Sequence, residues 1–228
     1  MLTAALAILM TAPQVKLPPM QTVTLGIFMR GTRPQGISQD ALAEMQKGHI
    51  ANLERLYRER KSPAAGPFEN GGDRRGIVIL EMPAKAAAQE FEQDPFVKDG
   101  LLKLEFYEWM VPKGMFGYPS AESFEMQKVM FAWVSKGPNY QDPPRDLDNQ
   151  NFPAHVNLNL DLMRQGRGLI GPLTTANPWA LGVYILETSE EKTMRAWLES
   201  DPHLKSGRLQ LNHLALYMGK GLFKRLTP

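Results

Sequence analysis

The sequence contains no cysteine among its 228 residues. This absence excludes disulfides, thiolate nucleophiles and cysteine-based metal sites, and it is compatible with either redox compartment. The chain also lacks a large excess of positive or negative charge, because it has 26 basic and 24 acidic residues, and it contains no conspicuous basic run. Nucleic acid is therefore not expected as a partner. A glycine-rich phosphate loop and a G-x-S-x-G motif are missing as well, which argues against phosphate-loop chemistry and a serine hydrolase.

Long hydrophobic runs are missing too, apart from the N-terminal stretch MLTAALAILMTA at residues 1–12. Twelve residues are too few to span a bilayer but fit the core of a signal peptide. No lysine or arginine precedes the run, and Met10 and Pro13 fit a small-residue cleavage site poorly. We expect an exported protein without a membrane span. The alternative is an N-terminal arm on a cytoplasmic protein, and in both cases residues 1–20 are set apart from the fold.

What the sequence does contain is an internal repeat. Its second half matches the first at an offset near 106, with one residue of drift either way. The matched positions are Gly31 with Gly137, His49 with His155, Gly66-Pro67 with Gly171-Pro172, Gly76 with Gly182, Asp94-Pro95 with Asp201-Pro202, and Gly100 with Gly207. Two copies of roughly 90 residues are too few for a solenoid. The repeat predicts two like units, residues 21–112 and 127–220, with a linker at 113–126 and a C-terminal tail at 221–228.

Each copy has the same expected element order. In the first copy, strands are expected at 23–29, 64–68, 76–82 and 102–111, from β-rich runs bounded by turn residues. Helices are expected at 39–60, after a capping Ser38, and at 84–93. In the second copy the strands are 129–135, 169–172, 181–186 and 209–217. Its first helix is expected to have Phe152, His155, Leu158 and Leu162 on the inward face, and its second helix is expected at 189–200. This β-α-β-β-α-β order is ferredoxin-like, so the fold class is α+β.

The packing of the two units follows from the strand pattern. Residues 102–111 alternate apolar and polar side chains, as a half-buried strand does. Both helices of a unit cover one face of its sheet, which leaves the other face to be buried. A second sheet of the same kind is its natural cover, so the two sheets are expected to pack face to face within one chain.

Two polar residues recur in both copies and are the candidate site residues. His49 lies on the apolar face of the first helix, and His155 lies at the matching place. Asp94 and Asp201 each precede a proline in the pattern D-P-x-[VL]-K-x-G. An aspartate before a proline also suits a helix cap, and a histidine on an apolar face is often merely packed, so a structural role is the alternative for all four.

The ordered set of these marks resembles the YciI-like (YCII-related) family, once in each copy. The marks are the helix histidine, the Gly-Pro after the second strand, the buried third strand and the D-P-x-x-x-x-G turn, and they span about four-fifths of the chain. The resemblance implies a dimeric α+β barrel, here as an internal pseudo-dimer, so that the chain is a monomer or self-associates further. It also implies active-site pairs of His49 with Asp94 and His155 with Asp201.

That resemblance implies a small-molecule lyase or isomerase that moves protons on a small organic acid, without cofactor or metal. A carboxylate on one imidazole nitrogen fixes the tautomer and leaves the other nitrogen as a base near neutral pH. Arg75 has Leu181 as its counterpart, so it could hold an anionic substrate in the first copy only. We therefore expect the His49 site to be the working one. The main alternative is a non-catalytic ligand-binding or scaffold protein, and a haem-using or cofactor-free monooxygenase has less support.

Overall fold

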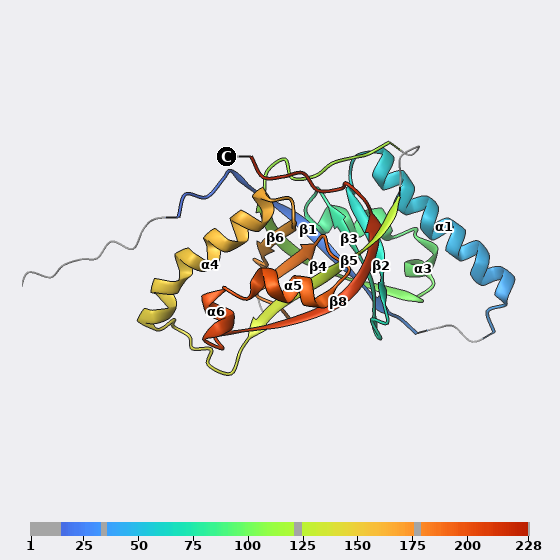
Figure 1. The fold of residues 1–228 in the computed structure, drawn as a ribbon. Coiled ribbons are helices and arrows are strands. Elements are labelled where there is room, and N and C mark those ends of the chain that lie inside the picture. The colour runs from blue at the N-terminus through green and yellow to red at the C-terminus, as the bar shows by residue number, and fades with distance from the viewer. Residues whose placement is uncertain (1–14, 33–35, 121–124, 176–178, 228) are drawn as a thin grey trace, which may run out of the picture.

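The computed structural model describes residues 15–32, 36–120, 125–175 and 179–227. Both units contain four strands and three helices in the same order (Figure 1). Unit 1 comprises β1 (Met20–Arg30), α1 (Gln39–Arg58), β2 (Ala64–Glu69), β3 (Arg74–Leu80), α2 (Ala84–Phe91), α3 (Pro95–Lys98) and β4 (Leu102–Pro112). Unit 2 comprises β5 (Met126–Lys136), α4 (Asp146–Arg164), β6 (Gly168–Pro172), β7 (Gly182–Leu186), α5 (Glu191–Leu198), α6 (Pro202–Lys205) and β8 (Leu209–Gly219).

The expected α+β class with two ferredoxin-like units is confirmed. Each Asp-Pro adds a short helix that the sequence did not predict as a separate element, α3 in unit 1 and α6 in unit 2. The first helix ends at Arg58 rather than Arg60, because Arg60 has a positive φ of 55°. The N-terminal run 1–12 lies outside the described residues, so the export signal stays a prediction. Among the described residues, no helix is long and apolar enough to cross a membrane.

The eight strands form one antiparallel sheet in the order β4-β1-β3-β2-β8-β5-β7-β6. The units join edge to edge where β2 pairs with β8. At the other seam β4 meets β6, through a bridge between Trp109 and Leu173 and a hydrogen bond from Trp109 Nε1 to the Gly171 carbonyl at 3.0 Å. The sheet therefore curls into a nearly closed barrel, and the inner faces of the two units meet inside it.

The repeated Gly-Pro pair is explained by these two seams. A Cβ on Gly66 would lie 1.7 Å from the Tyr217 carbonyl oxygen, and a Cβ on Gly171 would lie 2.0 Å from the Met110 carbonyl oxygen. Each glycine thus lets a strand of the other unit approach closely. The Gly-Pro pair, one of the features that carry the family resemblance, therefore has a structural role in this fold.

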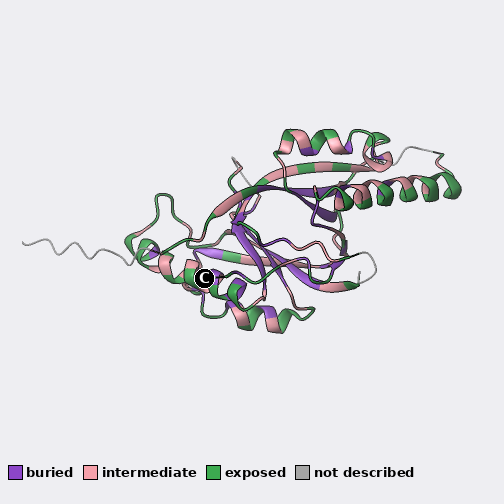
Figure 2. Cartoon of the chain, turned by 90° about the horizontal axis from the view of Figure 1, so that it is seen from above, coloured by how far each residue is buried: buried purple, intermediate pink, exposed green. Residues whose placement is uncertain are grey.

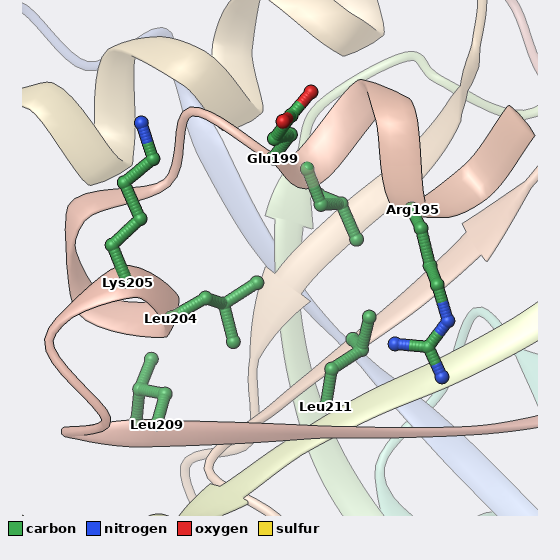
Figure 3. A pocket seen from close by; sticks show the side chains of 7 residues that line it. Arg195, Glu199, Leu204, Lys205, Leu209 and Leu211 are labelled. Atoms are coloured by element: carbon green, nitrogen blue, oxygen red, sulfur yellow. The ribbon is translucent and has the colours of Figure 1, made fainter. Parts of the chain in front are cut away.

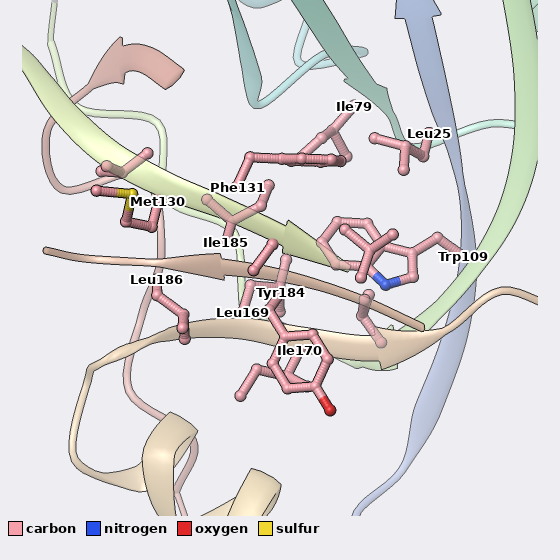
Figure 4. Close-up of a cluster of buried hydrophobic side chains, with 14 of the residues drawn as sticks. Leu25, Ile79, Trp109, Met130, Phe131, Leu169, Ile170, Tyr184, Ile185 and Leu186 are labelled. Atoms are coloured by element: carbon pink, nitrogen blue, oxygen red, sulfur yellow. The ribbon is translucent and has the colours of Figure 1, made fainter. Parts of the chain in front are cut away.

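The core fills the barrel and continues beneath the helices. On β3, Ile77 and Ile79 point into the barrel, whereas Val78 and Leu80 pack under α1 and α2. Figure 2 shows buried residues concentrated on the strands, and Figure 4 shows aromatic and aliphatic side chains from both units packed together, among them Phe131 and Trp109. Because both faces are covered, β3 is apolar and buried over its whole second part, from Gly76 to Leu80, rather than alternating.

The linker and the C-terminal tail pack against each other. Phe116 and Phe223 form a bridge, and the Leu226 N–H donates to the Met163 carbonyl on α4. Leu222 and Leu226 are buried. The tail at 221–227 is therefore part of the fold of unit 2.

Candidate functional site

The first candidate pair, His49 and Asp94, is brought together by two helices. His49 lies on α1, and Asp94 is the N-cap of α3. His49 Nδ1 is 2.9 Å from Asp94 Oδ2 and 3.1 Å from Oδ1. Asp94 Oδ1 also accepts from the Phe96 N–H at 3.1 Å, so the cap and the histidine share one carboxylate. The catalytic and capping interpretations of the Asp-Pro pair are thus compatible in this geometry.

A network of further side chains holds Asp94 in place. Asn52 Nδ2 donates to Asp94 Oδ2 at 3.1 Å and to the Glu90 carbonyl at 3.2 Å, while Asn52 Oδ1 accepts from Arg55. Asp94 is 1% exposed. Burial by itself raises the pKa of the Asp94 carboxyl, but the hydrogen bonds and charge of His49, with those of Asn52 and Phe96, outweigh it and leave that pKa lowered. Asp94 is therefore an anion at neutral pH.

Aromatic rings enclose His49. Phe28 meets the imidazole edge-on at 5.4 Å, and Phe96 stacks on it at 5.1 Å. The residue is 8% exposed. Arg75 is exposed, and its hydrogen bond among the described residues goes to the Gly72 carbonyl of its own hairpin at 3.3 Å. The structure therefore shows no hydrogen bond between Arg75 and the His49 pair within the described residues, and an anion-binding role for it stays a prediction.

The second pair, His155 and Asp201, repeats the geometry in unit 2. His155 lies on α4, and Asp201 caps α6. His155 Nδ1 is 2.7 Å from Asp201 Oδ2, while Asp201 Oδ1 accepts from the N–H groups of His203 at 2.8 Å and Leu204 at 3.3 Å. Burial opposes ionisation of Asp201, yet the His155 interaction and these backbone donors lower its pKa. Nδ1 of His155 accordingly carries its proton toward Asp201.

A cavity of about 680 Å³ lies beside His155, between α4, the sheet of unit 2 and the N-terminal segment. Its size is that of pockets for small molecules. The walls are mainly apolar, with Leu17 and Phe152 as exposed hydrophobic residues among them. The polar side chains in its lining are Tyr140, Asn149, His155, Asn159, Tyr184, His203 and Arg208.

Three of these polar groups could engage a ligand. His155 Nε2 is 3.3 Å from Asn159 Nδ2, and the buried Asn159 Oδ1 has no hydrogen-bond partner among the described residues. Burial, followed by the charge of Asp201, raises the pKa of Tyr184, so its hydroxyl stays protonated as a donor. The cavity thus presents a base, an unsatisfied acceptor and a hydroxyl donor.

A second set of polar groups, His203, Asp148, Arg145 and Arg208, packs against His155 through the ring of His203. His203 stacks on the imidazole of His155 at 4.9 Å, and its Nε2 donates to the Asp148 carbonyl at 3.0 Å. Burial lowers the pKa of His203, which keeps its ring neutral at pH 7. The side chain of Asp148 accepts from Arg145 and Arg208, and the Arg145 hydrogen bonds are the main reason its pKa falls to about 2.

A smaller hollow of about 340 Å³ lies outside the barrel, between α5, α6 and β8 (Figure 3). Its apolar lining consists of Leu198, Leu204, Leu209 and Leu211, and its charged lining consists of Arg195, Glu199 and Lys205. Arg195 is paired with Glu191 on the same helix. Because neither histidine–aspartate pair lines it, the hollow offers no comparable chemistry.

Comparison with known proteins supports the fold, but it does not show to which family the chain belongs. No family model matches the sequence, and no curated protein matches it. Among solved structures, it is similar to a single-residue variant of chlorite dismutase from Candidatus Nitrospira defluvii, with a TM-score of 0.56 at 10% identity over 86% of this chain and 90% of that one. A heme-binding protein from Thermus thermophilus gives 0.53 at 13% identity, over 92% and 95%. A protein from Lactobacillus acidophilus, provisionally assigned as a monooxygenase, gives 0.52 at 12%, over 90% and 99%. At these identities the likeness establishes a dimeric α+β barrel fold alone.

The residues of the cavity do not fit haem, the group named for the Thermus protein. Haem iron needs an axial ligand, most often a histidine nitrogen, and its propionates are commonly bound by cations. His203 Nε2 donates to a carbonyl, and His155 Nε2 would have to give up its contact with Asn159 to bind iron. Among the described residues of the lining, Arg208 is the single cation and is shared with Asp148. Of the described residues as a whole, no group of His, Asp and Glu side chains is arranged to hold a metal ion.

All four predicted histidine and aspartate residues are thus brought into pairs, whereas Arg75 is not joined to them. Sequence reasoning missed Asn159, Tyr184, His203 and Arg208. Asn159 could have been found, because it follows His155 by four residues and so shares its helix face. His203 and Arg208 have Phe96 and Leu101 as counterparts, and single-copy residues carry no repeat signal.

Proposed function

We propose that this chain is a YciI-like protein that catalyses proton transfer on a small organic acid, as a lyase or isomerase, at His155. The observation that carries the proposal is a His–Asp pair, with a partly buried His155 and a fully buried Asp201, that opens on a cavity of about 680 Å³. The sequence favoured His49 on the strength of Arg75. The cavity beside His155, and the aromatic enclosure of His49, favour the opposite assignment.

The chemistry follows from the tautomer. Asp201 accepts the Nδ1 proton of His155, so Nε2 holds a lone pair that can remove a proton from a bound substrate. The resulting imidazolium would be stabilised by the Asp201 carboxylate. The Tyr184 hydroxyl lines the same cavity as a protonated donor and would stabilise negative charge developing on a substrate oxygen. Asn159 would release Nε2 and orient the substrate through Oδ1.

Hydrogen–deuterium exchange tests this proposal without knowledge of the full reaction. The protein is incubated in D2O with a panel of small 2-oxo, hydroxy and unsaturated carboxylic acids, and exchange at carbon is followed by proton NMR. We expect one or more acids to exchange with the wild type and with His49→Asn, but not with His155→Asn. Thermal unfolding of both variants controls for folding.

The alternative function is ligand binding without turnover, within the same fold. The His49 pair favours a structural role in unit 1, because Asn52 binds Asp94 and the rings of Phe28 and Phe96 pack on His49. A complete lack of exchange with acids that bind would support this alternative. Exchange that persists in His155→Asn would instead refute His155 as the base.

A further inference from the structure

A charged cluster in the wall of the His155 cavity has no counterpart in unit 1. Its members are Arg145, Asp148, His203 and Arg208. The matching positions of unit 1 are Gln39, Leu42, Phe96 and Leu101. Unit 1 builds the same fold with neutral or apolar residues, so the fold does not require the cluster. A buried charged group that the fold does not require points to a ligand.

We propose that Arg208 binds the carboxylate of the substrate, and that the substrate of this cavity is a carboxylic acid with an apolar body. This assignment rests on the proposed function at His155 and names its substrate class. The sequence predicted anion binding by Arg75, on the hairpin of unit 1. The residue proposed here is instead Arg208, directly before β8 of unit 2.

The first argument is the balance of charge. Arg208 is 8% exposed, and Asp148 is 2% exposed. The Asp148 carboxylate is shared between Arg208 Nη1 at 3.1 Å and Arg145 Nε at 3.0 Å. Within the group of Arg145, Asp148 and Arg208, two guanidinium groups and one carboxylate leave one positive charge, and Arg208 is the member of this group that lines the cavity. A bound carboxylate would neutralise that charge.

The second argument is the free edge of the guanidinium group. Among the described residues, Arg208 makes hydrogen bonds through Nη1 alone, to Asp148 and to the Gln141 carbonyl at 3.0 Å. Its Nε and Nη2 groups are left for a ligand. The centroid of the Tyr140 ring lies 4.6 Å from the guanidinium carbon, a cation–π contact that restricts the movement of the group. An arginine fixed in this way offers two parallel donors, which suit a carboxylate.

The third argument is the link to the base. Asp148 contacts Arg208 through its side chain and His203 through its carbonyl, and His203 stacks on His155. The anion site and the base therefore share one wall of the cavity. The remaining walls are lined by side chains such as Val156, Met163 and Leu181, which suit a hydrocarbon or an aromatic ring.

Matched acid and amide probes test this assignment. We would titrate the full-length protein at pH 7 with hexanoate, octanoate and 4-phenylbutanoate, and with the amide of each, by calorimetry and NMR. For at least one pair, the acid should bind about tenfold more tightly than its amide, since one charge-assisted contact typically gives that factor. The amide has the same shape and lacks the charge, so the ratio reports on the carboxylate contact.

The main variant replaces two residues of unit 2 by their counterparts in unit 1. Asp148→Leu/Arg208→Leu copies the Leu42 and Leu101 of unit 1 and leaves neither charge buried without its partner. This double variant should bind acid and amide equally, while Arg208→Lys should retain part of the preference. Arg75→Ala should leave the preference unchanged. Thermal unfolding confirms that each variant is folded.

Several results would overturn the assignment: equal binding of acid and amide by the wild type, no binding of any probe at millimolar concentration, a preference that survives the double variant, or one that Arg75→Ala removes. His155→Asn separates this inference from the proposed function. If that variant keeps the acid preference while no acid exchanges in the wild type, Arg208 binds a carboxylate in a protein without the proposed turnover.

Discussion

Replacing each buried aspartate by asparagine tests how the two histidine pairs are held. The two carboxylates differ in one side-chain partner, and Asp201 accepts from a second backbone N–H, that of Leu204. Asp201 accepts from His155 on Oδ2 and from backbone N–H groups of α6 on Oδ1. Asp94 has the same two kinds of partner and also accepts from Asn52 Nδ2 on Oδ2.

The expected cost follows from these partners. In Asp201→Asn, the amide oxygen can keep the backbone bonds and the amide nitrogen can donate to His155, so the loss of charge costs about 2 kcal/mol. In Asp94→Asn, the new amide nitrogen meets Asn52 Nδ2. The Asn52 amide cannot turn over, because its oxygen accepts from Arg55 and its nitrogen donates to the Glu90 carbonyl. One buried donor stays unpaired, which adds about 1–3 kcal/mol.

Thermal unfolding at pH 7 measures the difference. A chain of this size loses about 2–4 °C in Tm per kcal/mol, so Asp201→Asn should lose about 4–8 °C and Asp94→Asn several degrees more. NMR of ¹⁵N-labelled imidazole should show the His155 proton moving from Nδ1 to Nε2 in Asp201→Asn. Equal losses in the two variants would refute the role given to Asn52. A His155 ring that keeps its Nδ1 proton would refute control of the tautomer by Asp201.

Three further predictions concern pH and the seams of the barrel. Burial lowers the pKa of His203, so the folded state resists its protonation and stability should fall as the pH drops below about 6.5; His203→Phe should flatten this loss in urea titrations between about pH 7 and 5, and an unchanged slope would contradict it. Gly171→Ala places a Cβ 2.0 Å from a backbone oxygen of β4, so it should lower Tm far more than Gly182→Ala, whose nearest contact is 3.3 Å; equal effects would show that the seam yields easily. Trp109→Phe removes the buried bond to the Gly171 carbonyl and should cost about 0.5–1.5 kcal/mol in urea unfolding, the net contribution of a typical hydrogen bond, and no loss would show that the bond does not hold the seam.

The sequence alone determined the fold of each unit and singled out the two histidines and two aspartates, which the family resemblance then paired. Strand runs, helix periodicity and the Asp-Pro turn are local signals, and the duplication presented each of them twice. The ring of His49 or His155 reaches the carboxylate because the histidine lies on the inward face of a long helix, against which the capped turn packs. Such a pairing can be predicted once both elements are placed.

Only the tertiary structure decided how the units join and where a ligand can enter. Gly66 and Gly171 allow strands of opposite units to touch, a contact that neither unit contains by itself. The cavity is at His155, whose neighbour is His203 where unit 1 has Phe96. Arg208 becomes a candidate because folding places it on Asp148, 60 residues away in the sequence. The role of a charge buried in a cavity wall cannot be predicted from spacing along the chain. Its energy depends on which partners surround it in the folded protein and on which of its donors they leave free.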